Sequence, residues 1–128
     1  MNIGDLSKHL NNGERWGFRT NPDSLDYLGW VLISKRTPPV IYPYHFSQSI
    51  ERHERLVKEA AELKACPFHV SVLELNRTVH ESGVYESTED YRVRDNHYFA
   101  TLEEALMFFE SQHLNLKDIK SGFDIDAP

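Results

Sequence analysis

Residues 28–35 read LGWVLISK, a run with apolar side chains at both odd and even positions. Neighbouring side chains of a strand point to opposite faces, so a segment that is apolar on both faces is covered on both sides. This run therefore predicts a central strand of a sheet. The Pro38-Pro39 pair ends it, because proline lacks the N–H group that the ladder of hydrogen bonds needs.

Other segments around this run also have the pattern of strands. Residues 68–76, FHVSVLELN, place Phe68, Val70 and Val72 on one face and Ser71, Leu73 and Leu75 on the other. We expect this strand to continue through Thr78-Val79-His80 to a turn at Ser82-Gly83, with a return strand beginning at Val84-Tyr85. The remaining expected strands and turns are residues 16–20, an edge segment at 40–44, a strand at 91–94, a turn at Asp95-Asn96 and a short strand at 97–99.

Two main helices are expected from apolar residues at 3.6-residue spacing. The first begins near a cap at Ser47 or Ser49 and ends before Pro67. The second begins with a capping box of Thr101 and Glu104. Its apolar side is formed by Leu102, Ala105, Leu106, Phe109 and His113. A shorter helix at residues 5–10 precedes the first strand.

This order of elements predicts the α+β class. We expect a single globular domain over residues 1–128, with an antiparallel or mixed sheet of about five strands packed against the two main helices. The chain has 128 residues and one cysteine, Cys66, so it has no internal disulfide and suits a reducing compartment. The sequence shows neither a signal peptide nor a membrane-length apolar run, and we therefore expect a cytoplasmic protein.

The acidic residues are concentrated in the second half of the chain. Residues 1–64 hold 8 acidic and 9 basic residues, whereas residues 65–128 hold 12 and 5. The segment 81–90 contains four acids and no base. Such a surface either is a solvated face that aids solubility or attracts a basic partner. It argues against direct nucleic-acid binding, which requires excess positive potential.

One short motif raises the possibility of catalysis. His69-Val70-Ser71-Val72 resembles the H-x-[ST] half-site of the two-histidine phosphoesterases, in which two such strands face each other across a phosphate. The other histidine–x–serine triplets begin at His45 and His80. On one continuous strand, His69 and His80 would lie about 35 Å apart and could not act on one phosphate. A structural strand histidine is the simpler interpretation.

Metal, thiol and nucleotide chemistry have weaker support. His53-Glu54 is followed by Val57 where an H-E-x-x-H zinc motif needs its second histidine. Cys66 precedes proline at the end of a helix, where the helix dipole disfavours a thiolate. No phosphate-binding glycine loop is present. We therefore expect no metal site, no cofactor and no catalytic residues.

The basic and aromatic residues suggest either nucleic-acid binding or a protein interface. Arg92 and Arg94 near several tyrosines resemble a single-strand nucleic-acid platform, but the adjacent acids favour cross-strand ion pairs. Tyrosines bordered by acids are typical of protein interfaces. The residues 38–44, PPVIYPY, form a stiff apolar segment that suits a preorganised contact.

These features predict a non-catalytic binding protein whose partner is a basic protein. The most specific form is an acidic inhibitor, such as an immunity protein that neutralises a nuclease-type toxin by masking its basic active site. A phage-type inhibitor of a host defence or nucleic-acid enzyme fits the same charges, and a small phosphoesterase using His69 and Ser71 is the enzymatic alternative. The expected partner-binding residues are Glu81, Tyr85, Glu86, Glu89, Asp90, Asp124 and Asp126.

Overall fold

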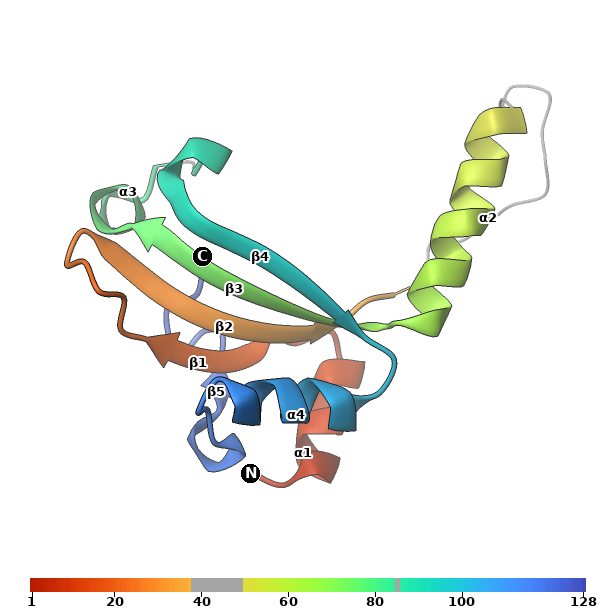
Figure 1. Ribbon diagram of the computed structural model, residues 1–128, viewed down its shortest axis with the longest axis horizontal. Coiled ribbons are helices and arrows are strands. Elements are labelled where there is room, and N and C mark those ends of the chain that lie inside the picture. Colours follow the sequence, from red (N-terminus) through yellow and green to blue (C-terminus); the bar gives the residue numbers. More distant parts are fainter. Residues whose placement is uncertain (38–49, 85) are drawn as a thin grey trace.

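A five-stranded antiparallel sheet forms the centre of the computed structural model, which describes residues 1–37, 50–84 and 86–128. The strands lie in the order β4-β3-β2-β1-β5 (Figure 1). Their bounds are β1 Trp16–Thr20, β2 Tyr27–Lys35, β3 Phe68–Asn76, β4 Tyr91–Phe99 and β5 Lys120–Ser121. The predicted central strand is confirmed, because β2 lies in the middle and pairs with β1 and β3. The α+β class is confirmed as well.

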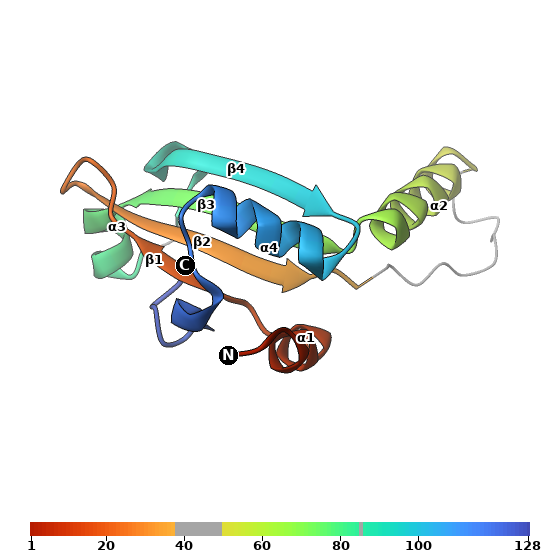
Figure 2. The same ribbon diagram turned by 60° about the horizontal axis from the view of Figure 1, so that its bottom comes forward.

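One face of the sheet, the first face, is covered by two helices. These are α1, Ile3–Asn11, and α4, Leu102–Ser111, which both lie on the same side of the strands (Figure 1 and Figure 2). Phe109 of α4 packs edge-to-face on Phe18 of β1, with 5.2 Å between the ring centroids. The first-face core consists of Leu6, Leu10, Phe18, Val31, Ile33, Val70, Leu102, Ala105, Phe109 and Ile119.

The predicted cap of α4 by Thr101 is confirmed, but the reciprocal bond of a capping box is not formed, because the Glu104 carboxylate binds the residue before the cap. The Thr101 hydroxyl accepts a hydrogen bond from the Glu104 N–H at 3.2 Å, and the Glu104 carboxylate accepts one from the Ala100 N–H at 3.3 Å. The first contact satisfies a donor that the first turn of the helix leaves unpaired, and the second holds the residue before the cap. His113 does not belong to the apolar side of α4, because it is exposed, follows the helix and has a φ of 61°.

The opposite face of the sheet, the second face, has a smaller core. It consists of Leu28, Trp30, Leu32, Leu73, Leu75 and Ile125. Its cover is α3, Arg77–Ser82, together with the last residues of the chain. Ile125 of this C-terminal segment is part of the second-face core. The His80 ring of α3 packs edge-to-face on the Trp30 ring, with 5.0 Å between the centroids.

The helix predicted before Pro67 is present as α2, Ile50–Ala65, but it does not pack on the sheet. It extends away from the end of the sheet where β3 begins (Figure 1). None of its described residues is buried. Its apolar spacing correctly predicts a helix, whereas the covering role expected for it belongs to α1 and α4.

Three expectations about strands and turns are wrong. The strand that contains His69 ends at Asn76, whose side chain accepts a hydrogen bond from the Val79 N–H at 3.1 Å and so caps α3. The expected strand through residues 78–80 is therefore helical, and Gly83 closes this helix at a φ of 70°. Asp95-Asn96 is not a turn, because β4 continues through it and Asn96 pairs with Ser71.

Val84 begins no return strand; β4 starts at Tyr91. The extended segment predicted at 40–44, the caps Ser47 and Ser49, and Tyr85 lie outside the described residues. Among the described residues, no helix has the length and apolarity to cross a membrane.

Candidate partner-binding surface

Acidic side chains from four separate segments gather at the end of the sheet away from α2. This surface, here called the acidic end, includes the β1–β2 loop, α3 and the segment of the short helix η1 (Thr88–Asp90) (Figure 1). The C-terminal turn starts beside Arg15 and reaches this surface through Asp126, which contacts His80 of α3. Its carboxylates belong to Asp23, Asp26, Glu81, Glu86, Glu89, Asp90, Asp124 and Asp126. All of them are exposed except Asp90, which is half-buried.

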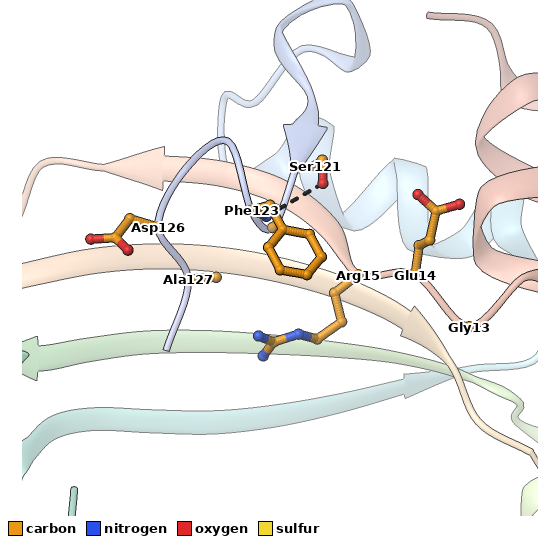
Figure 3. Close-up of a pocket in the computed structure, with 8 residues that line it drawn as sticks. Gly13, Glu14, Arg15, Ser121, Phe123, Asp126 and Ala127 are labelled. Carbon is orange, nitrogen blue, oxygen red and sulfur yellow. Dashed lines mark hydrogen bonds between the residues drawn. The ribbon is translucent and has the colours of Figure 1, made fainter. Parts of the chain in front are cut away.

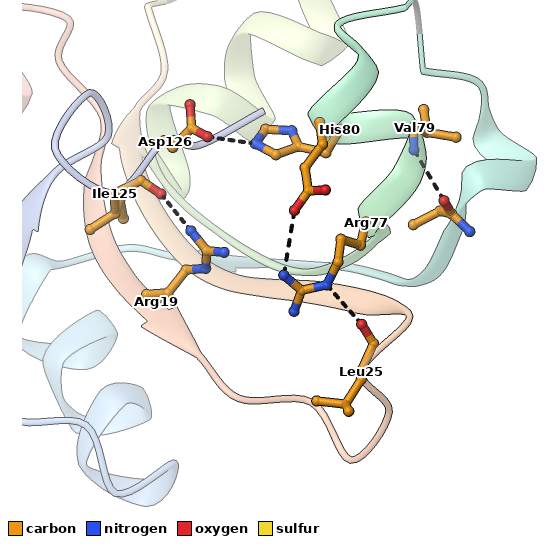
Figure 4. A network of polar contacts seen from close by, with 9 residues as sticks. Arg19, Leu25, Arg77, Val79, His80, Ile125 and Asp126 are labelled. Atoms are coloured by element: carbon orange, nitrogen blue, oxygen red, sulfur yellow. Dashed lines mark hydrogen bonds and ion pairs between the residues drawn. The ribbon is translucent and has the colours of Figure 1, made fainter.

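Arg77 holds the β1–β2 loop against α3. Its side-chain Nε donates to the Leu25 carbonyl at 2.8 Å, and its backbone N–H donates to the Asp26 carbonyl at 2.8 Å. The same guanidinium lies 3.5 Å from the Glu81 carboxylate, one helical turn away (Figure 4). The loop carboxylates and Glu81 are therefore fixed on one surface although they are far apart in the sequence.

Arg92 ties the same loop to the strands. Its guanidinium pairs with Asp23 at 2.7 Å and also with Glu74 of β3. The expectation that the basic residues form cross-strand ion pairs is thus confirmed for Arg92. Its partners are Glu74 and Asp23 rather than the acids of residues 81–90. Asp23 remains 88% exposed in this pair, and exposed pairs of this kind contribute little to stability.

His80 joins the C-terminal turn to α3. Its Nε2 lies 3.0 Å from the Asp126 carboxylate (Figure 4). The His80 side chain is 9% exposed, whereas that of Asp126 is 83% exposed. The contact therefore anchors the turn through a nearly buried imidazole and leaves most of the carboxylate available to solvent or to a partner.

The carboxylates of the remaining acids differ in whether they already form hydrogen bonds or ion pairs within the protein. Asp90 accepts hydrogen bonds from the backbone and hydroxyl of Ser87, at 2.7 and 3.1 Å, and so has a local structural role. The side chains of Asp26, Glu89 and Asp124 form no ion pair with the described residues. These three carboxylates have the greatest capacity to pair with a cation from outside.

Glu86 lies beside the phenol of Tyr91. Burial raises the pKa of Tyr91 above its ordinary value, and the Glu86 carboxylate raises it further through its charge and a hydrogen bond, while Arg94 and Arg15 oppose this. Tyr91 therefore stays a neutral hydrogen-bond donor to Glu86 at neutral pH. Among the predicted residues, Glu81 pairs with Arg77 of α3 and Asp126 contacts His80 of the same helix, whereas Tyr85 lies outside the described residues.

The acidic segment at 81–90 does not by itself indicate Asp23 and Asp26. Their sequence signal is the turn cluster Asn21-Pro22-Asp23-Ser24, which predicts an exposed loop but not its neighbours. Exposed apolar side chains were also missed at this end. Leu25 is 86% exposed and Val84 is 59% exposed.

His69 and Ser71 lie on the second face near α2, away from the acidic end. The His69 Nε2 is 2.7 Å from the Asn96 Oδ1 and 3.2 Å from the Ser71 hydroxyl, and its ring stacks on Tyr98. With Asn96 in this orientation, Nε2 carries the proton donated to Oδ1 and cannot also take one from Ser71. The geometry favours a structural histidine.

His69 and His80 also remain apart, although the strand between them is shorter than expected. Seven residue steps of β3 separate His69 from Asn76, or roughly 23 Å of strand, before α3 begins. The described residues contain no group of three or more His, Cys, Asp or Glu side chains arranged to hold a metal ion. The chain matches none of the protein-family models, curated proteins or solved structures with which it was compared.

Proposed function

We propose that this chain is a non-catalytic binding protein whose acidic end docks on a basic protein surface. The observation that carries the proposal is the convergence of carboxylates from four segments, held by Arg77, Arg92 and His80. In its most specific form, the protein is an inhibitor of the immunity type that covers the phosphate-binding groove of a nuclease-type toxin. Its carboxylates would then occupy the positions of the substrate phosphates.

Charge at this surface acts mainly on the rate of association. Carboxylates on one end of a small domain produce a field that steers a cationic partner toward that end. Salt screens exposed charges over about 8–10 Å at physiological ionic strength, so the steering weakens as salt rises. Leu25 and Val84 add exposed apolar area to the same end, which a fully acidic solvated face would not need.

The test compares two variants that lose the same charge at opposite ends of the molecule. In the first, Glu81, Glu86, Glu89 and Asp90 are replaced by their amides. In the control, the four α2 acids Glu51, Glu54, Glu59 and Glu62 become glutamines. Each tagged variant is used for capture from a lysate of the organism that carries the gene, and the captured protein is identified and purified.

We expect the acidic-end variant to lose most of the capture seen with the unchanged protein, and the α2 variant to retain it. Identification of the captured protein then separates a toxin from a host defence enzyme. Its activity can be measured directly and should be inhibited by the unchanged protein but not by the amide variant. Equal capture by both variants would refute a binding role for the acidic end.

A further inference from the structure

The C-terminal turn presents a phenyl ring entirely to solvent. Phe123 is 98% exposed, more than any other large hydrophobic side chain in the described part of the chain. It is not among the residues that pack against the core clusters of either face. Single exposed apolar residues are common and by themselves indicate nothing. The turn that carries Phe123 is, however, unusually well held.

Backbone contacts fix the turn internally and to the start of β1. The Gly122 N–H donates to the Arg15 carbonyl at 2.8 Å, and the Ala127 N–H donates to the Gly122 carbonyl at 2.9 Å. The Phe123 N–H donates to the Ser121 hydroxyl at 3.3 Å (Figure 3). The base of the Phe123 side chain is thus fixed on both sides.

The second half of the turn is anchored in the second-face core. Ile125 is 7% exposed there, and its carbonyl accepts hydrogen bonds from the Trp30 indole at 2.8 Å and from Arg19 at 3.3 Å. Asp126, which follows, has a φ of 54° and meets His80. A non-glycine residue in the left-handed region is uncommon and is maintained by its surroundings.

This combination differs from an ordinary loop tip. A buried isoleucine, an indole hydrogen bond and the contact between His80 and Asp126 hold the turn, and they orient Phe123 outward rather than into the core. An aromatic ring whose backbone is already ordered loses little conformational entropy on binding. Aromatic residues in such positions frequently carry a large share of the binding energy of an interface.

We propose that Phe123 is the aromatic anchor through which the acidic end binds its partner, and that it inserts into an apolar pocket bordered by lysine or arginine. Asp124 and Asp126 follow Phe123 in the same turn, and both are exposed, so their carboxylates would meet the basic rim of that pocket. A cavity of about 360 Å³ lies beside Phe123, lined in part by Glu14, Arg15 and Asp126 (Figure 3). It offers a matching hollow for a partner side chain. The assignment rests on the proposed function.

The first experiment asks which surface touches the partner. A photo-crosslinking benzoyl-phenylalanine is placed at position 123 or, as a control, at Met107, which is 67% exposed on α4. We expect position 123 to crosslink the protein that the unchanged chain captures, and position 107 not to. Crosslinking of that protein from position 107 alone, or of a second copy of this chain from position 123, would overturn the assignment.

The second experiment uses the captured and purified partner in a kinetic binding assay. Phe123→Ala should raise the dissociation rate by at least about tenfold and change the association rate by less than about threefold. Met107→Ala should change neither rate. Phe123→Tyr, which retains the ring, should restore slow dissociation. Because Phe123 is so exposed, the melting temperature of Phe123→Ala should equal that of the unchanged protein.

The outcomes separate the two proposals. If binding depends on salt and on the acidic-end carboxylates but Phe123→Ala dissociates at the unchanged rate, the anchor assignment is wrong and the proposed function stands. If binding is independent of salt, the proposed function is wrong. If the unchanged protein captures no partner, both are wrong.

Discussion

The two faces of the sheet are covered in different ways. The first face is covered by α1 and α4, two helices with periodic apolar residues and side-chain caps. The second face is covered by the six residues of α3 and by a C-terminal segment without regular structure over most of its length. Both covers bury strand residues completely, as Ile33 and Trp30 show with 0% exposure each.

This difference shows which kinds of cover can be recognised from sequence. A helix can be recognised in a sequence from the 3.6-residue spacing of its apolar side chains and from its capping residues. The C-terminal segment SGFDIDAP has neither, and its binding to the sheet depends on Trp30, Arg19 and His80, which lie far away along the chain. It therefore looks like an acidic tail in the sequence, although Ile125 within it belongs to the core.

The largest expected effects compare the two faces directly. Trp30→Ala and Phe109→Ala each remove a side chain that is at most 1% exposed, one from each face. We expect each variant to lose about 3–5 kcal/mol of unfolding free energy, through lost apolar burial and the cavity left behind. Urea unfolding monitored by circular dichroism measures both. A cost below about 1 kcal/mol for Trp30→Ala would show that the second face is not a true core.

A second comparison concerns neighbours within the C-terminal turn. Ile125→Ala should cost roughly 2–5 kcal/mol, because this side chain is buried between the turn and the strands. The matched control, Phe123→Ala, should change the unfolding free energy by less than about 0.5 kcal/mol, since its ring is exposed. Equal costs for both, measured by the same urea titration, would mean that the turn is not held as described.

A smaller effect is expected at the helix cap of the first face. Thr101→Ala removes the acceptor for the Glu104 N–H and should lower the unfolding free energy by about 1 kcal/mol. Thr101→Ser retains the hydroxyl and serves as the control. An unchanged melting temperature for Thr101→Ala would show that this cap does not stabilise α4.

Several elements of the fold could be predicted because their signals are local. The strand LGWVLISK, the periodic helix after residue 49 and the Thr101 cap are all present. The errors arise where tertiary contacts decide. Asn76 belongs to an alternating pattern but also caps a helix, and Asp95-Asn96 has turn chemistry but is held extended by pairing with Val72 and Ser71.

The candidate site was predictable in its charge but not in its composition. The acids of residues 81–90 indicate an acidic surface, whereas the addition of Asp23 and Asp26 depends on the long-range contacts of Arg77 and Arg92. Likewise, α2 is predicted as a helix by its periodicity, but periodicity does not specify what a helix packs against. Its described residues remain unburied.

The central claim is that the acidic end attracts a basic partner, and the salt dependence of the association rate tests it most directly. The captured and purified partner is bound by the unchanged protein, by the acidic-end amide variant and by the α2 control, from about 50 to about 500 mM salt. Association of the unchanged protein and of the control should slow at least about tenfold over this range. The acidic-end variant should associate slowly throughout and change little. An association rate of the unchanged protein that is the same at low and high salt would contradict the account.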